Sequence, residues 1–149
     1  MIFESKDEFL NKLNKLENFK VLGIDFGTKK SGLAIYNSAI KIVTPLQILQ
    51  NINQNFNELL KIIDENCING IIIGNPIKLN GIDTENINQI NKLVKLLSNE
   101  IKLPIILVDE RFTTSLANTL MKQANIKRKK RNKIDDLVSA SIILEEFFY

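Results

Sequence analysis

The amino-acid sequence predicts an α/β fold in which a mixed β-sheet carries helices on both faces. Three short extended segments follow one another at 20–26, 31–37 and 40–44, which is the arrangement of an antiparallel meander. Two wholly apolar runs come later, at 71–73 and 104–108, and segments with helical periodicity alternate with them. Antiparallel strands followed by alternating strands and helices indicate a mixed sheet whose parallel strands are buried between helices.

The amino-terminal residues predict a helix ahead of the first strand. Ser5 and Glu8 form a capping-box pattern, and apolar residues recur at helical spacing over 5–16. We expect this helix to form an extension at 1–19, followed by the main domain at 20–149. The extension mixes acidic residues with lysines and has no uninterrupted apolar core, so it is not expected to be a secretory signal.

Four further helices are predicted from apolar periodicity or from capping residues at their starts. In chain order they are expected from 56 to 63, from 83 to 99, from 113 to 123 and from 134 to the carboxyl terminus. The first of them overlaps an Asn-rich stretch at 51–57, which we interpret as compositional bias. Asp135 and Asp136 are expected in the first turn of the last helix, where negative charge favours the helix dipole.

The composition excludes several classes of protein. No apolar run approaches the roughly 18 residues of a membrane span, so no membrane partner is expected. A single cysteine, Cys67, fits a reducing compartment, and we expect a cytoplasmic protein. The chain has no histidine, which excludes Ser-His-Asp and Cys-His catalysis and most zinc sites. Any catalytic metal must therefore bind to oxygen ligands, which favours Mg²⁺ or Mn²⁺.

Three carboxylates are candidates for such a site. Asp25 ends the first buried strand and Glu110 follows the last one, so the two acids share a crevice if those strands are parallel and close. Asp136 shares a helical face with Ala140 and Ile143, which predicts that it points toward the sheet. Three ionised carboxylates repel one another, and one or two Mg²⁺ ions would remove that repulsion. Two such ions would also suit phosphodiester hydrolysis.

Each carboxylate also has an ordinary structural interpretation. Asp25 could be a turn residue that closes a hairpin. Glu110 could be a surface partner of Arg111. Asp136 could be a charge at a helix start, and the choice between it and Asp135 depends on the phase of the helix.

Basic residues are concentrated in one short segment, at 127–133. This segment holds six of the 20 basic residues of the chain, and the remainder are outnumbered by 17 acidic residues. It is predicted to be a loop that contacts phosphates, with a solvated surface loop as the alternative. The predicted phosphate contacts are Thr28, Lys29, Lys30, Arg111, Lys127, Arg128, Lys129, Lys130, Arg131 and Lys133.

Four motifs, in this order, resemble the YqgF family, also called RuvX-like. They are G-I-D-F-G-T-K-K-S-G-L-A at 23–34, G-N-P-I-K-L-N-G at 74–81, V-D-E-R-F-T-T at 108–114 and K-K-R-N-K-I-D-D-L-V-S-A-S-I-I-L at 129–144. The resemblance implies a ribonuclease H-like fold with a five-stranded mixed sheet in the order 3-2-1-4-5, in which strand 2 is antiparallel. It implies that the strand ending at Asp25 and the strand preceding Glu110 are neighbours or lie one strand further apart. It also places the family's catalytic acids on Asp25, Glu110 and Asp136.

The resulting hypothesis is a Mg²⁺- or Mn²⁺-dependent nuclease acting on structured RNA. The resemblance implies a ribosomal RNA precursor, pre-16S rRNA, as substrate and ribosomal particles as partners. Cleavage of four-way DNA (Holliday) junctions is the alternative, which would require a two-fold dimer. A non-catalytic nucleic-acid-binding module would explain the basic segment but leaves the three acids unexplained. An actin-like or Hsp70-like ATPase shares the Asp-x-Gly-Thr hairpin, but it needs a second domain to enclose the nucleotide.

Overall fold

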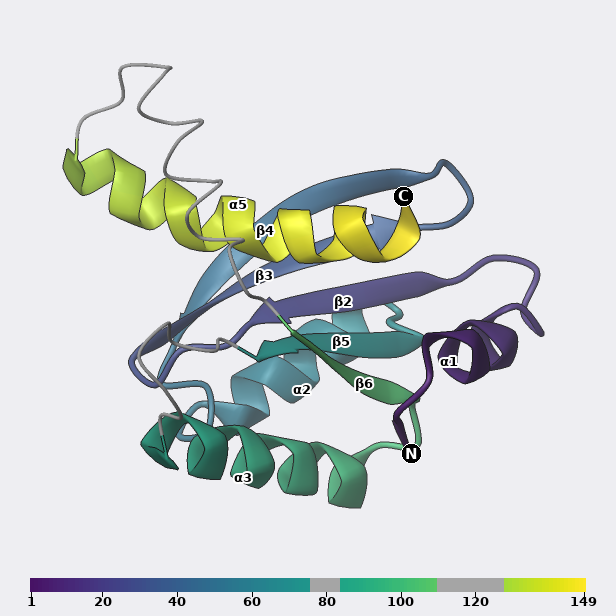
Figure 1. Ribbon diagram of the computed structural model, residues 1–149, viewed down its shortest axis with the longest axis horizontal. Helices are drawn as coiled ribbons and strands as arrows, with labels where there is room; N and C mark the ends of the chain where they lie inside the picture. The colour runs from purple at the N-terminus through teal and green to yellow at the C-terminus, as the bar shows by residue number, and fades with distance from the viewer. Residues whose placement is uncertain (76–83, 110–127) are drawn as a thin grey trace.

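A computed structural model describes residues 1–75, 84–109 and 128–149 (Figure 1). The strands are β1 (Ile2–Phe3), β2 (Lys20–Asp25), β3 (Lys30–Asn37), β4 (Ile42–Gln50), β5 (Gly70–Asn75) and β6 (Ile105–Asp109). The helices are α1 (Lys6–Leu13), α2 (Phe56–Glu65), α3 (Thr84–Glu100) and α5 (Arg128–Phe148). The helix predicted at 113–123 lies outside the described residues. No described helix has the length and apolar character needed to cross a membrane.

The strands form one mixed sheet in the order β1-β6-β5-β2-β3-β4. Strands β2, β3 and β4 pair antiparallel, whereas β5 pairs parallel with both β2 and β6. This arrangement confirms the predicted order of five strands. The predicted strand count was wrong, because β1 adds a sixth strand parallel to β6. A two-residue strand is too short to show the alternating pattern from which strands are predicted.

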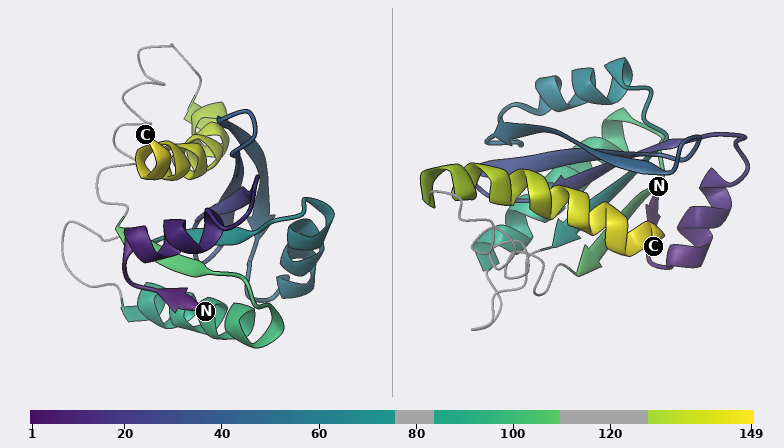
Figure 2. Two further views of the ribbon diagram at one scale, coloured as in Figure 1. Left: turned by 90° about the vertical axis from the view of Figure 1, so that its right-hand side faces the viewer. Right: turned by 90° about the horizontal axis from the view of Figure 1, so that it is seen from above.

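Two hydrophobic clusters cover opposite faces of this sheet. Helices α1 and α5 cover one face, called here the α5 side, and α2 and α3 cover the other, called the α2/α3 side (Figure 2). Successive side chains of a strand point to opposite faces. In β2, Val21 therefore belongs to the α5-side cluster and Leu22 to the other. In β6, Ile106 faces α5 and Ile105 faces α2 and α3.

The amino-terminal segment is part of the α5-side core. Helix α1 begins after Ser5, whose hydroxyl oxygen accepts a hydrogen bond from the Glu8 backbone N–H at 3.4 Å, as the capping pattern predicts. Its buried face consists of Phe9 and Leu13. The Phe9 ring meets Phe147 of α5 edge-to-face, with 5.6 Å between ring centroids. The helix ends at Leu13 and not at residue 16 as predicted.

The third strand is predicted at 40–44, but β4 begins at Ile42 and continues to Gln50. The predicted strand thus stops short of Pro45. The structure keeps Pro45 inside β4, paired with Ala34 next to a register shift. Proline is tolerated there because β4 is an edge strand, where a missing backbone N–H leaves no ladder hydrogen bond unmade.

The last helix begins six residues earlier than predicted. Helix α5 starts at Arg128, so the basic residues at 128–133 are helical and the predicted loop was wrong for them. Lysine and arginine are good helix formers, and their charge alone does not interrupt a helix. As a consequence, Asp135 and Asp136 lie beyond the first turn, which contains no acidic residue.

At the other end of the helix, the Phe148 ring stacks on the Tyr36 ring with 3.9 Å between ring centroids, and burial raises the pKa of the Tyr36 phenol.

Candidate functional site

Asp25 lies at the carboxyl end of β2, as predicted, and it is partly buried. Two positions before it, Gly23 faces Leu144 of α5, and Val21 packs in the same α5-side cluster. Because strand residues alternate between faces, Asp25 falls on the α5 side of the sheet. This is the face on which the final helix was expected to place its carboxylate.

The positions directly beside Asp25 are both glycines. Asp25 is paired with Gly32 of β3 on one side and with Gly74 of β5 on the other, and Gly74 is paired in turn with Val108 of β6. Neighbouring strands are about 4.8 Å apart, so Asp25 and Val108 are separated by roughly 10 Å across the sheet. Strand β5, which lies between them, places no side chain in this row, and neither does β3 on the other side of Asp25.

The strands leading to Asp25 and to Glu110 run in the same direction with β5 between them. Their carboxyl ends therefore reach the same edge of the sheet, where Asn75 is paired with Asp109. This is the second of the two arrangements that the family resemblance implied. Glu110 itself follows Asp109 and lies outside the described residues. In β6 the even positions, Ile106 and Val108, belong to the α5 side, and Glu110 continues that series in the sequence.

Position 136 lies in α5, four residues before the fully buried Ala140. The backbone thus puts this position one helical turn from the buried face of α5, and the side chain of Asp136 lies outside the described part of the chain. Among described side chains, no group of three or more acidic, cysteine or histidine residues could hold a metal ion. Asp25 is the predicted ligand that the structure describes, and its carboxylate oxygens are suitable for Mg²⁺ or Mn²⁺. The convergence of the three acids stays a prediction.

Helix α5 approaches β2 unusually closely just before Asp25. A Cβ atom built at Gly23 would lie 2.6 Å from the Leu144 Cγ atom, which is closer than two carbon atoms pack. Leu144 is fully buried in the α5-side cluster. Any side chain at position 23 would push α5 away from the sheet. Gly23 therefore sets the distance between α5 and the strand that ends in Asp25.

Substituting Gly23 with alanine is expected to destabilise the fold by about 1–3 kcal/mol, because the added methyl group overpacks the contact with Leu144. Urea unfolding of Gly23→Ala, Leu144→Ala and the double variant measures this. Shortening Leu144 makes room for the methyl group, so the double variant should lose less than the sum of the single losses, by about 0.5–3 kcal/mol. Strictly additive losses would show that the two residues do not meet.

The Ser31 side chain stabilises the hairpin turn after Asp25, a role that the sequence motif does not indicate. The Ser31 hydroxyl accepts a hydrogen bond from the Gly27 N–H at 3.1 Å, and it lies 3.3 Å from the Gly27 carbonyl oxygen, to which it donates. A Cβ atom at Gly27 would lie 2.2 Å from the Lys30 carbonyl oxygen, so only glycine fits this turn. The turn exposes Thr28 and Lys29, two of the predicted phosphate contacts. The sequence offered one signal for this role of Ser31, namely a serine at the start of a strand.

The other predicted contacts are less completely described. Lys30 begins β3 and is partly buried. Arg111 and Lys127 lie outside the described residues. The remaining basic residues, at 128–133, occupy the first turns of α5, and their side chains lie outside the described part.

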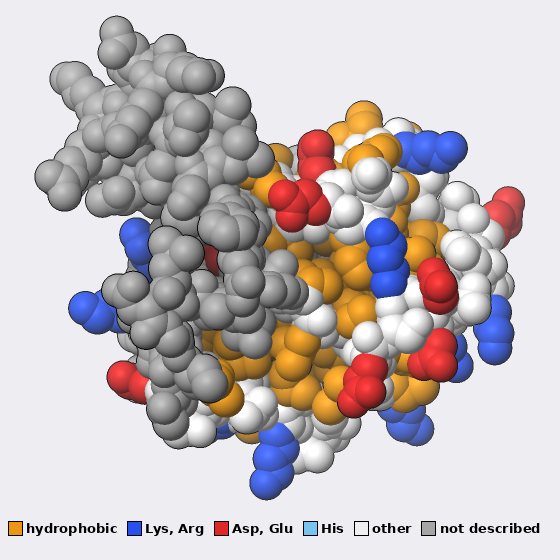
Figure 3. Space-filling view, viewed as in Figure 1, with side chains coloured by type: hydrophobic (Ala, Val, Ile, Leu, Met, Phe, Trp, Pro, Cys, Tyr) orange, Lys and Arg blue, Asp and Glu red, His pale blue; other side chains and the backbone are white. Residues whose placement is uncertain are grey.

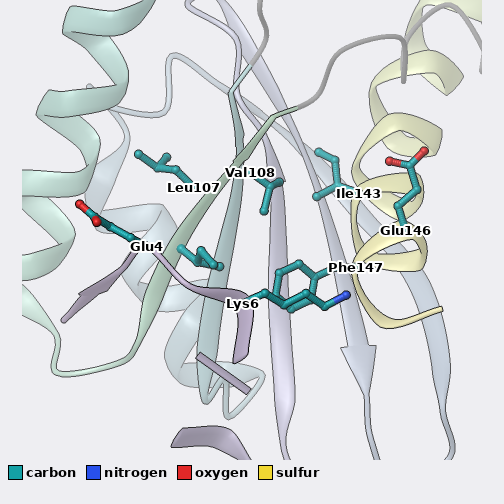
Figure 4. Close-up of a pocket in the computed structure, with 8 residues that line it drawn as sticks. Glu4, Lys6, Leu107, Val108, Ile143, Glu146 and Phe147 are labelled. Atoms are coloured by element: carbon teal, nitrogen blue, oxygen red, sulfur yellow. The ribbon is translucent and has the colours of Figure 1, made fainter. Parts of the chain in front are cut away.

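A cavity of about 360 Å³ lies on the α5 side between β6 and the second half of α5 (Figure 4). Val108, Ile143 and Phe147 form apolar walls, and the amine of Lys6 lies 4.8 Å from the centroid of the Phe147 ring. Figure 3 shows hydrophobic side chains gathered in the middle of this face, with charged side chains around them. Val108, which is paired with Gly74 beside Asp25, lines this cavity, and Asp25 is not among the described residues that do so.

Comparisons with known proteins agree with this arrangement. Residues 19–149 match the family model described as RuvX: Holliday junction resolvase. A protein of Rickettsia africae (strain ESF-5) named "Putative pre-16S rRNA nuclease" is 42% identical over 147 residues, which cover 97% of this chain and 94% of the relative. A protein of the same name from Orientia tsutsugamushi (strain Ikeda) is 44% identical over 146 residues, covering 97% and 92%.

Two solved Holliday-junction resolvases share the fold of this chain. T. thermophilus RuvC in complex with a Holliday junction substrate superposes with a TM-score of 0.55 at 14% identity, covering 87% of this chain and 94% of that one. Fowlpox virus resolvase in complex with substrate Holliday junction DNA gives a TM-score of 0.55 at 16% identity, covering 86% and 96%. At such low identity these likenesses show the fold, and they confirm the predicted ribonuclease H-like architecture.

Proposed function

This chain belongs to the RuvX family, and from that premise we propose that it is a metal-dependent nuclease that processes the ends of pre-16S rRNA. The observation that supports the proposal best is the position of Asp25. Its carboxylate stands at the carboxyl end of a parallel strand, between two glycine positions, on the face covered by α5. An ordinary turn residue would need neither the flanking glycines nor this face.

We assign Asp25, Glu110 and Asp136 as the residues that would hold Mg²⁺ or Mn²⁺. When bound, the cation supplies positive charge for the phosphate oxygens and lowers the pKa of a water molecule. Strand β2 holds the Asp25 carboxylate in place. Gly23 sets the distance between α5 and this strand, and Ser31 stabilises the turn that follows it. With no histidine in the chain, carboxylates are the available groups for orienting the attacking water.

The catalytic acids all belong to the 20–149 part of the chain, and we propose that the 1–19 segment contributes to stability only. We further propose that the protein acts in the cytoplasm on RNA within ribosomal particles. The 42–44% identity to relatives named as pre-16S rRNA nucleases supports an RNA substrate over a DNA one.

Holliday-junction resolution is the second candidate, favoured by the likeness to two resolvases in complex with junction DNA. The deciding experiment gives the purified protein an end-extended 16S rRNA precursor or a DNA four-way junction, each with Mg²⁺ or Mn²⁺. We expect cleavage of the RNA near its mature end, dependence on the cation, and an intact junction. Symmetric cutting of the junction with intact RNA would instead establish a resolvase, and it should then accompany a two-fold dimer in solution.

Neutralising the basic start of α5 is expected to weaken RNA binding in a salt-dependent manner. In the triple variant Lys129→Gln, Lys130→Gln and Arg131→Gln, the slope of log K against log salt should fall by roughly 0.7–0.9 for each phosphate that the protein no longer neutralises. Fluorescence anisotropy with labelled RNA over a salt series measures the slope. The matched control neutralises three exposed lysines around α3, Lys92, Lys95 and Lys102. An equal decrease of the slope in the control would show that only net charge matters.

A further inference from the structure

A second, smaller cavity of about 120 Å³ lies beside the hairpin turn that follows Asp25. It is lined from three elements: the turn itself, the β4–α2 connection and the start of α3. Among the described residues, its polar lining consists of Thr28, Asn51, Asn53, Gln54, Glu85 and Gln89. Four of these six side chains are carboxamides. A water molecule takes about 30 Å³ in the liquid, so the space is that of several waters or of one small ring.

Asn53, one of the lining residues, carries an unused hydrogen-bond acceptor. Its Nδ2 donates to the Gln89 Oε1 atom at 2.8 Å and to the Gln89 carbonyl oxygen at 3.0 Å, which fixes the orientation of the carboxamide. The Asn53 Oδ1 atom is buried and has no hydrogen-bond partner among the described residues. A buried polar atom without a partner is costly and normally has one. A ligand with an N–H donor would satisfy it.

The charge of the lining indicates which class of ligand fits. Among the described residues, Glu85 is the one charged side chain that lines the cavity, and no lysine or arginine does so. A phosphate group would therefore be repelled. Carboxamides instead match the donor and acceptor edges of nucleobases. Phe26 and Ile52 add apolar surface suited to the face of a flat ring, so the lining is that of a site for a neutral, hydrogen-bonding ring.

The cavity is close to Asp25 along the chain but on the other face of the sheet. Phe26 packs in the α2/α3-side cluster, whereas Asp25 belongs to the α5 side. The exposed turn at Thr28 and Lys29 lies between the two and is tied to the cavity wall, because the Asn51 N–H donates to the Lys29 carbonyl oxygen at 2.8 Å. A nucleic-acid strand with a phosphate at Asp25 would have to pass over this turn for a neighbouring base to enter the cavity.

We propose that this carboxamide cavity binds one unstacked nucleobase of the substrate strand, next to the phosphate that is cleaved. The inference rests on the proposed nuclease function and extends it with a subsite for a base. Single-stranded or extruded bases are the usual targets of such pockets, because their hydrogen-bonding edges are accessible. This gives part of the Asn-rich stretch at 51–57, interpreted above as compositional bias, a role in binding the base.

A direct test titrates the wild-type protein with nucleosides and follows the side-chain amide signals of Asn53 and Gln89 by NMR. Cytidine and adenosine should shift these signals in a saturable manner, and ribose 5-phosphate should not. This measurement needs no catalysis, so it remains decisive even if the protein cleaves no nucleic acid. Shifts with ribose 5-phosphate, or no shifts with any nucleoside, would overturn the proposal and leave a water-filled cavity.

A second test removes single bases from a cleavable substrate. In the wild type, an abasic nucleotide at one position beside the cleavage site should lower kcat/KM by about tenfold, the size of one base contact. In Asn53→Asp, which keeps the size of the side chain but adds a negative charge, the same abasic substitution should change kcat/KM by less than about twofold. Asn57→Ala is the matched control, since Asn57 is exposed in the same Asn-rich stretch and does not line the cavity. Equal abasic effects in Asn53→Asp and the control would contradict the proposal.

Discussion

Asp25→Asn is expected to lower the cleavage rate of the RNA precursor by more than about a hundredfold while the protein stays folded. Losing a group that merely supports a metal ligand costs roughly 10–100-fold, so losing the ligand itself should cost more. Glu110→Gln and Asp136→Asn should have effects of the same size. Single-turnover cleavage with saturating Mg²⁺ measures the loss, and circular dichroism checks the fold.

The thermal midpoint gives an independent measure of the same site. Mg²⁺ that binds only the folded protein raises the Tm of the wild type, and this rise should disappear in Asp25→Asn. The matched control is Asp64→Asn, because Asp64 is exposed on α2 and should retain both activity and the Mg²⁺ response. If Asp25→Asn cleaves as fast as the control, Asp25 is a turn residue and the proposed site fails.

Phe9→Ala is expected to destabilise the protein by about 3–5 kcal/mol, the usual cost of removing a buried phenylalanine. Phe9 is fully buried, its ring contacts Phe147, and even a methyl group at Gly70 would come within 3.2 Å of its Cζ atom. At roughly 2–4 °C per kcal/mol for a chain of this size, the Tm should fall by about 6–20 °C.

The control for this prediction is Leu16→Ala in the same amino-terminal segment. Leu16 is 45% exposed, so its truncation should change the Tm by less than about 2 °C. Thermal unfolding followed by circular dichroism compares the two variants. If both fall equally little, the first 19 residues are a loosely attached extension and not part of the core.

Much of this fold could be predicted from local patterns. The Ser5 cap, the antiparallel meander and the buried strand 71–73 all depend on residues close in sequence, and each is confirmed. The resemblance to the YqgF family added the order of five strands, which no local pattern contains. Strand β1 was missed because it depends on pairing with the distant strand β6, and the continuation of β4 through Pro45 was missed because it depends on β4 being an edge strand of the sheet.

The candidate site likewise has parts that could be predicted from local patterns and parts that could not. The end of the β2 strand at Asp25 could be predicted from the apolar run that precedes it. The glycines on each side of Asp25 could not, because Gly32 and Gly74 meet it only through the register of two different strand pairs. The unsatisfied Asn53 oxygen could not be predicted either, because Gln89, which fixes the Asn53 side chain, is 36 residues away in the sequence.

The early start of α5 makes the basic residues at 128–133 and position 136 parts of one continuous helix. From residue 128 to residue 136 the helix axis rises by about 12 Å, and the helix continues without interruption to Leu144, which rests on Gly23. A flexible loop would let the basic residues move independently of position 136. Under the proposed function, a continuous helix would keep the phosphates bound at 128–133 at a fixed distance from the carboxylate at position 136, so the cleavage site would be set by distance along the RNA backbone.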